Sequence, residues 1–73
     1  MTQEERAALR AEASATRLEE AAQRQRALST AESAADFRSI MAHANRLAAK
    51  AARLEADAAE GNSAQGGRPG AEK

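Results

Sequence analysis

Apolar residues recur along the second half of the chain at intervals of three and four residues. They form two series, Phe37, Ala44, Ala51 and Ala58 in one, and Ile40, Leu47 and Leu54 three residues further on in the other. Met41 and Ala48 widen this stripe on one side. A seven-residue period of this kind is typical of a helix that packs lengthwise against another helix.

The first half of the chain repeats with the same period, as "ERAALRA", "EASATRL" and "EEAAQRQ". We interpret its inward series as small residues, namely Ala8, Ala15 and Ala22 with Ala11, Leu18 and Gln25, flanked by Ala7, Ser14 and Ala21. Two charged rows would then face outward, with Glu5, Glu12 and Glu19 in one and Arg10, Arg17 and Arg24 in the other. This pattern predicts a narrow, alanine-faced helix.

Capping signals divide the chain into two helices. Thr2 and Glu5 have the spacing of a capping box, and Ser29 and Glu32 repeat that spacing inside the chain. We therefore predict helices over about 3–28 and about 30–60 with a tight connection near residues 28–30. The alternative is one unbroken helix, because neither Gly nor Pro interrupts residues 3–60. Gly61 suits the position just after a helix end.

The two helical patterns fit each other as an antiparallel hairpin. A chain reversal near Ser29 would bring together residues whose numbers sum to about 58 or 59, which places Leu18 beside Ile40 and Met41. The predicted fold is thus all-α, with a helical hairpin over 1–60. The segment 61–73, "GNSAQGGRPGAEK", is rich in glycine and predicts a flexible, disordered tail.

The large apolar residues are too few for a substantial core. Of the 31 residues behind the apolar share of 42%, 22 are alanine. Chains this short commonly need a disulfide, a metal or a partner chain, and this one has no Cys. We expect the second helix to drive dimerisation into a four-helix bundle through Phe37, Ile40, Met41, Leu47 and Leu54. A helix of a partner protein in that groove is the alternative.

Positive charge gathers in the same segment. Residues 37–54 contain no Asp or Glu, and Arg38, Arg46, Lys50 and Arg53 are the predicted contacts to a partner. Nucleic acid is the weaker alternative as that partner, since the net charge is zero and the only aromatic residue, Phe37, belongs to the apolar stripe.

Catalytic and cofactor signatures are absent from the sequence. It has no Gly-rich phosphate loop and no metal-binding His pair. His43 lies beside the apolar stripe, where we interpret it as a boundary residue, with a pH-sensitive contact or a catalytic or metal-binding role as lesser alternatives. No segment approaches the length of a membrane span, so we expect a soluble cytoplasmic protein without membrane contact, cofactor or enzymatic activity.

These observations predict a small, non-enzymatic helical interaction protein. It would self-associate and bind a partner protein as a regulator or adaptor. The alternative is an RNA- or DNA-binding helical hairpin that uses the basic outer face of its second helix, and a structural subunit of a larger assembly is a third class.

Overall fold

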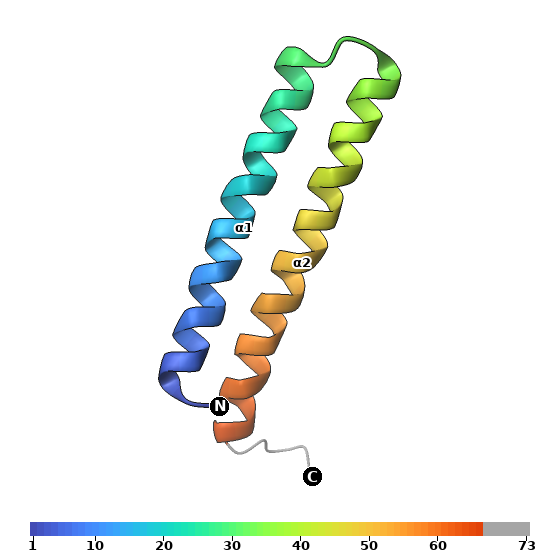
Figure 1. The fold of residues 1–73 in the computed structure, drawn as a ribbon. Helices are drawn as coiled ribbons and strands as arrows, with labels where there is room; N and C mark the ends of the chain where they lie inside the picture. Colours follow the sequence, from blue (N-terminus) through green and yellow to red (C-terminus); the bar gives the residue numbers. More distant parts are fainter. Residues whose placement is uncertain (67–73) are drawn as a thin grey trace.

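The computed structural model of the 73-residue chain describes residues 1–66, with the side chains of residues 61–66 left out of the description. Two helices, α1 (Gln3–Thr30) and α2 (Ala34–Gly66), run antiparallel and are joined by residues 31–33 (Figure 1). No strand is found in the described part of the chain. The predicted hairpin is confirmed, and the alternative of one unbroken helix is wrong. Its principal extents are 53 × 26 × 11 Å, so the two helices form a single layer.

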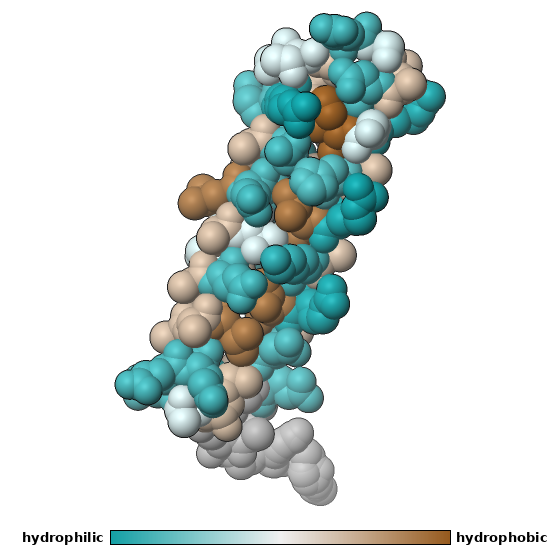
Figure 2. Space-filling model, in the orientation of Figure 1, coloured by the Kyte–Doolittle hydropathy of each residue, from teal (hydrophilic) through white to brown (hydrophobic). Residues whose placement is uncertain are grey.

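The core lies along the seam between the helices and consists mainly of alanine. The buried apolar residues are Ala13, Ala27, Ile40, Ala44, Ala51 and Ala58. Met41, Leu47 and Leu54 are half-buried beside them on α2. Brown apolar atoms accordingly follow the line between the helices, bordered by teal polar groups (Figure 2). The face predicted for the second helix therefore packs against α1, as its seven-residue period indicated.

The orientation predicted for the first helix is wrong. Leu18, which was expected beside Ile40, is 73% exposed, whereas Ala13 and Thr16 are buried. All the other residues predicted to face inward from α1 are exposed as well: Ala7, Ala8, Ala11, Ser14, Ala15, Ala21, Ala22 and Gln25. The inward side of α1 instead carries Arg6, Leu9, Ala13, Thr16, Glu20, Gln23 and Ala27, which are buried or half-buried. α1 thus presents roughly the opposite side to α2.

The position of the turn also differs from the predicted one. The chain reverses at residues 31–33, about three residues later than expected. Side chains that bond across the hairpin consequently have residue numbers that sum to between 62 and 72. The charged rows of α1 then lie beside α2 and form ion pairs with it, whereas the predicted orientation would have left them in solvent.

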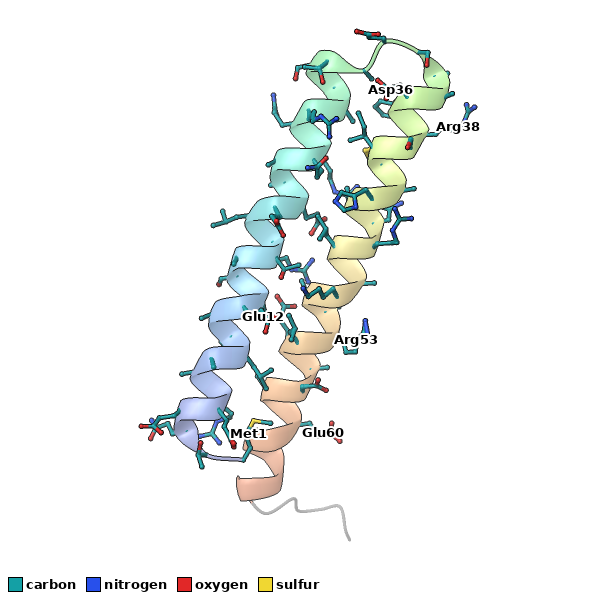
Figure 3. The ribbon with its side chains drawn as sticks, in the orientation of Figure 1. Met1, Glu12, Asp36, Arg38, Arg53 and Glu60 are labelled. Atoms are coloured by element: carbon teal, nitrogen blue, oxygen red, sulfur yellow. The ribbon has the colours of Figure 1, made fainter. Side chains whose placement is uncertain are left out.

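Capping at the turn uses a different serine from the predicted one. The hydroxyls of Ser29 and Thr30 donate to the carbonyls of Gln25 and Arg26, both at 2.8 Å, and so remain inside α1. Ser33 Oγ accepts the backbone N–H of Asp36 at 3.0 Å. The Asp36 carboxylate, beside the turn in Figure 3, accepts the backbone N–H of Glu32 at 3.1 Å. The predicted pair of Ser29 and Glu32 is therefore wrong.

The outer ends of the two helices differ in how well they were predicted. The capping box at the start of α1 is confirmed, since Thr2 N–H donates to Glu5 Oε1 at 2.8 Å and Glu5 N–H donates to Thr2 Oγ1 at 3.0 Å. α2 continues to Gly66, beyond the predicted end near residue 60, so Gly61 does not end the helix. Residues 67–73, the rest of the predicted tail, lie outside the described residues.

Candidate interaction surfaces

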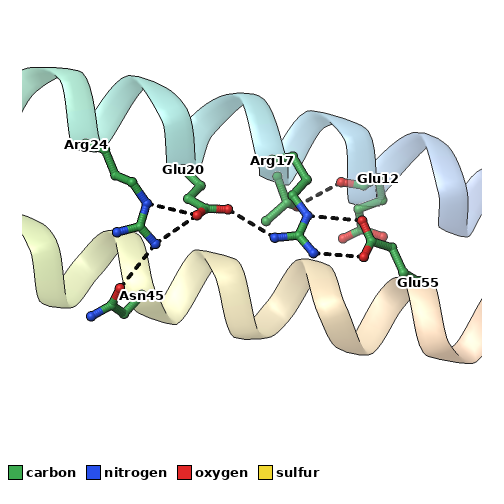
Figure 4. A network of polar contacts seen from close by, with 7 residues as sticks. Glu12, Arg17, Glu20, Arg24, Asn45 and Glu55 are labelled. Atoms are coloured by element: carbon green, nitrogen blue, oxygen red, sulfur yellow. Dashed lines mark hydrogen bonds and ion pairs between the residues drawn. The ribbon is translucent and has the colours of Figure 1, made fainter.

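A line of polar contacts joins the two helices along one edge of the seam (Figure 4). The Arg17 guanidinium donates from Nε to Glu55 Oε2 at 3.1 Å and from Nη2 to Glu55 Oε1 at 2.8 Å. This two-point geometry is the strongest form of an arginine–carboxylate pair. Further along, Arg24 Nη2 donates to Asn45 Oδ1 at 3.2 Å. These contacts hold Arg17 and Arg24, two of the three members of the arginine row of α1, against α2.

Glu20 is the one acidic side chain on the inward side of α1. It is only 15% exposed, and its carboxylate bonds to Arg24, at 2.8 Å, and to Arg17, at 3.3 Å. The hydrogen bond from Arg24 is the largest effect on Glu20 and, with that from Arg17, holds the pKa of its carboxyl below the usual range despite partial desolvation. The hydrogen bonds from Arg17 similarly lower the pKa of Glu55.

These lowered pKa values predict acid sensitivity of the fold. Because both carboxyls titrate at a lower pH in the folded state, the stability they add is present at neutral pH and is lost as the pH falls below ~4. We expect the thermal midpoint to fall in that range, and Glu20→Gln to remove part of the fall. Circular dichroism melts across the acid range measure it. Glu19→Gln is the control, since Glu19 is exposed and has no ion pair within the described residues; an identical effect of both substitutions would contradict the account.

The opposite edge of the seam is more open. Lys50 Nζ lies 3.7 Å from Glu12 Oε2, and both side chains are about half exposed. His43 is exposed along this edge of α2. No group of three or more His, Asp or Glu residues that could hold a metal ion occurs among the described residues. His43 therefore lacks neighbours that would make it part of a metal site there.

The predicted partner-binding residues divide into two sets. Arg38, Arg46 and Arg53 are exposed, and none of them forms an ion pair within the part of the chain that the structure describes. Figure 3 shows Arg38 and Arg53 pointing away from α1. Lys50 is separate from them, because it turns toward Glu12 across the seam. We name the three arginines the basic face of α2.

The predicted self-association residues are largely occupied within the hairpin. Ile40 is 6% exposed, and Met41, Leu47 and Leu54 are half-buried against α1. Phe37 retains the most exposure of the five, at 36%. Their role in self-association remains a prediction, with Phe37 the most accessible member.

A shallow groove of about 530 Å³ runs beside the Arg17–Glu55 pair. It is lined by Arg10, Ala13, Ser14, Arg17, Leu18 and Glu55. A smaller one of about 260 Å³ adjoins it and shares Arg10 and Glu55. Both lie at the edge of the seam, where the small side chains of Ala13, Ser14 and Ala58 leave space.

Comparison of the chain with protein-family models, with curated proteins and with solved structures finds no match. Neither helix has, within the described residues, a stretch of the length and apolarity needed to span a membrane. The residues and their arrangement are therefore the only basis for a functional argument.

Proposed function

We propose that this chain is a non-enzymatic helical interaction protein of the cytoplasm that self-associates and binds a partner protein with an acidic surface, as a regulator or adaptor. The observation that carries the proposal is the distribution of charge in the hairpin. Glu12, Glu20 and Glu55 pair across or along the seam. The outward sides of the helices, from 7 to 28 on α1 and from 38 to 59 on α2, then contain no acidic residue.

The outward side of α2 suits an acidic partner. Its residues are all exposed: Arg38, Ser39, Ala42, Arg46, Ala49, Ala52, Arg53, Ala56 and Ala59. Arg46 and Arg53 are one heptad apart, about 10 Å along the helix. The alanines between them let another surface approach the backbone, where the guanidinium groups can bond carboxylates at two points. This combination favours a protein segment with carboxylates at similar spacing.

The exposed apolar residues support self-association. Leu18 and Leu28 are 73% and 75% exposed, and Phe37 adds a partly exposed ring. The hairpin alone buries mainly alanine, which leaves a chain of this size with little stability unless another chain covers more of its apolar surface. Sedimentation equilibrium of the pure chain tests this part of the proposal. We expect a dimer, and a monomer at every concentration would contradict it.

Partner binding through the basic face of α2 gives a separate prediction. A photo-reactive amino acid at position 49, between Arg46 and Arg53, should cross-link in the native cells to a protein whose labelled segment is rich in Asp and Glu. The double substitution Arg46→Gln and Arg53→Gln should remove most of that adduct, because the charge that attracts the segment is lost. Adducts that survive this substitution unchanged would contradict the proposal. Arg10→Gln, on an exposed position of the other helix, is the control.

Nucleic acid is the second candidate partner, and the same three arginines favour it. They are free of ion pairs within the described residues and could contact phosphates. Electrophoretic retardation of short RNA and DNA duplexes at low salt decides between the two. A retarded complex whose affinity falls steeply with added salt and is lost in the double variant would favour nucleic acid over an acidic protein.

A further inference from the structure

The side of α1 that faces away from α2 is poor in charge over six turns of helix, with Arg10 and Arg26 at its margins. Its residues, all exposed, are Ala7, Ala8, Ala11, Ser14, Ala15, Leu18, Ala21, Ala22, Gln25 and Leu28. We call them the outer face of α1. Helices at a protein surface normally carry charged and polar residues on the side away from the core. This helix departs from that pattern, since its inward side includes Arg6, Glu20 and Gln23 while its outward side consists mainly of alanine and leucine.

Two leucines make this face more than a run of small residues. Leu18 lies near its middle and Leu28 near its end, and each leaves about three quarters of its surface in solvent. Covering one such side chain stabilises an assembly by ~1.5–3 kcal/mol. The alanines around Leu18 let a second helix approach closely. The face extends over 22 residues, which is about 33 Å.

The two edges of the outer face have opposite charge. On one edge lie Arg10, Arg17 and Arg24, and on the other Glu5, Glu12 and Glu19, followed in the same row by Arg26. The edges are assigned from the contacts they make: Arg17 bonds Glu55 on one side of the seam, and Glu12 pairs with Lys50 on the other. Arg10 and Glu19 have no ion pair within the described residues. Over residues 5–24 the face is therefore framed by one basic and one acidic row.

This framing determines which arrangement of two copies is favourable. If two outer faces meet with the helices antiparallel, each row lies beside the same row of the other copy, so like charges oppose each other. If they meet with the helices parallel, the arginine row of each copy lies beside the glutamate row of the other. Edge charges of this kind set the orientation of packed helices. The face is complementary to itself only in the parallel arrangement.

We propose that the outer face of α1 binds the outer face of α1 in a second copy of this chain, with the two helices parallel. The inference rests on the self-association in the proposed function and locates its surface. It places the two α1 helices at the centre of the dimer and the two α2 helices at its outside, where the basic face of α2 stays open for the acidic partner. A second copy is the occupant because the chain supplies both the apolar face and the matching charge rows.

Two matched substitutions test this surface by sedimentation equilibrium. Ala11→Glu places a carboxylate on the outer face of α1, beside the same group of the other copy, whereas Ala49→Glu makes the same change on the outward side of α2. Both positions are exposed in the hairpin, so both variants should keep its helical content by circular dichroism. Ala11→Glu should raise the dissociation constant by about tenfold or more, which corresponds to ~1.4 kcal/mol. Ala49→Glu should leave it unchanged.

The outcomes separate this inference from the proposed function. A wild-type dimer that Ala11→Glu weakens and Ala49→Glu does not would support both. A wild-type dimer that is insensitive to Ala11→Glu would overturn the α1 surface and leave self-association standing. A monomeric wild type would overturn both. Leu18→Gln is the second variant in case Ala11→Glu loses helicity, and it should weaken the dimer in the same direction because it removes the largest apolar side chain near the centre of the face.

Discussion

Replacing Ala51 by Asp should unfold the hairpin. Ala51 has no exposed surface, because α1 covers it completely at the seam. A carboxylate there would lose its water without gaining a partner, at a cost of several kcal/mol. A core of this size supplies only ~3–5 kcal/mol of stability in total. We therefore expect the far-ultraviolet circular dichroism of Ala51→Asp at neutral pH to show loss of most of the helical signal.

The neighbouring residue provides the control for this substitution. Ala52 is exposed on the outward side of α2, and Ala52→Asp brings the same loss of helix propensity, ~0.7 kcal/mol. Its helical signal should be close to that of the wild type. Equal helical content in the two variants would contradict the described orientation of α2 in the hairpin.

Ile40→Ala should give the second large effect, a loss of about 2–4 kcal/mol in the free energy of unfolding. Ile40 is 6% exposed and is the largest residue of the buried core, so its removal leaves a cavity between two helices that already meet through alanines. Urea titration followed by circular dichroism measures the loss. The control is Leu18→Ala, measured at protein concentrations where the chain is monomeric.

Leu18→Ala should change the stability of the monomer by no more than about 0.5 kcal/mol, since Leu18 is 73% exposed. The sequence alone predicted Leu18 and Ile40 as packing partners. Under that prediction both substitutions would be costly to a similar degree. The difference between them thus measures which side of α1 faces α2.

The second helix could be predicted from the sequence because its large apolar residues occur on one side only. Ile40, Leu47 and Leu54 leave a single orientation that buries them, and the structure has that orientation. The start of α1 was predictable for a similar reason, since Thr2 and Glu5 have one partner each. In both cases a specific side chain has only one favourable place.

The orientation of α1 could not be predicted in this way. A strict seven-residue repeat built on alanine produces several sides that look alike, and the side with Leu18 has the stronger apolar character. The position of the turn is also left open by the sequence, because two serines compete for it: Ser29 with Glu32, and Ser33 with Asp36. Both have capping spacing, and the structure uses the second.

Predicting the ion pairs between the helices required both the correct turn and the correct orientation of α1. Arg17 and Glu55 are 38 residues apart, so only the correct turn and rotation bring them together. Glu20 was not expected on the inward side of α1, although its pair with Arg24, four residues further on, follows from the sequence spacing. In the observed orientation of α1, the small residues first interpreted as its core-facing side are exposed. They form the surface to which we propose that a second copy of the chain binds.

The distance between two copies of one spin label tests the parallel pairing of α1 most directly. The chain has no cysteine, so Glu4→Cys provides a single labelling site at the start of α1. Position 4 lies one heptad before Ala11, on the same side of the helix, but precedes the outer face, which begins at Ala7. In the parallel dimer the two labels should lie less than about 25 Å apart, because packed helix axes are ~8–10 Å apart and the label arms add the remainder. A separation of about 40 Å, as expected for antiparallel helices crossing near Leu18, or the absence of any dipolar coupling, would contradict the account.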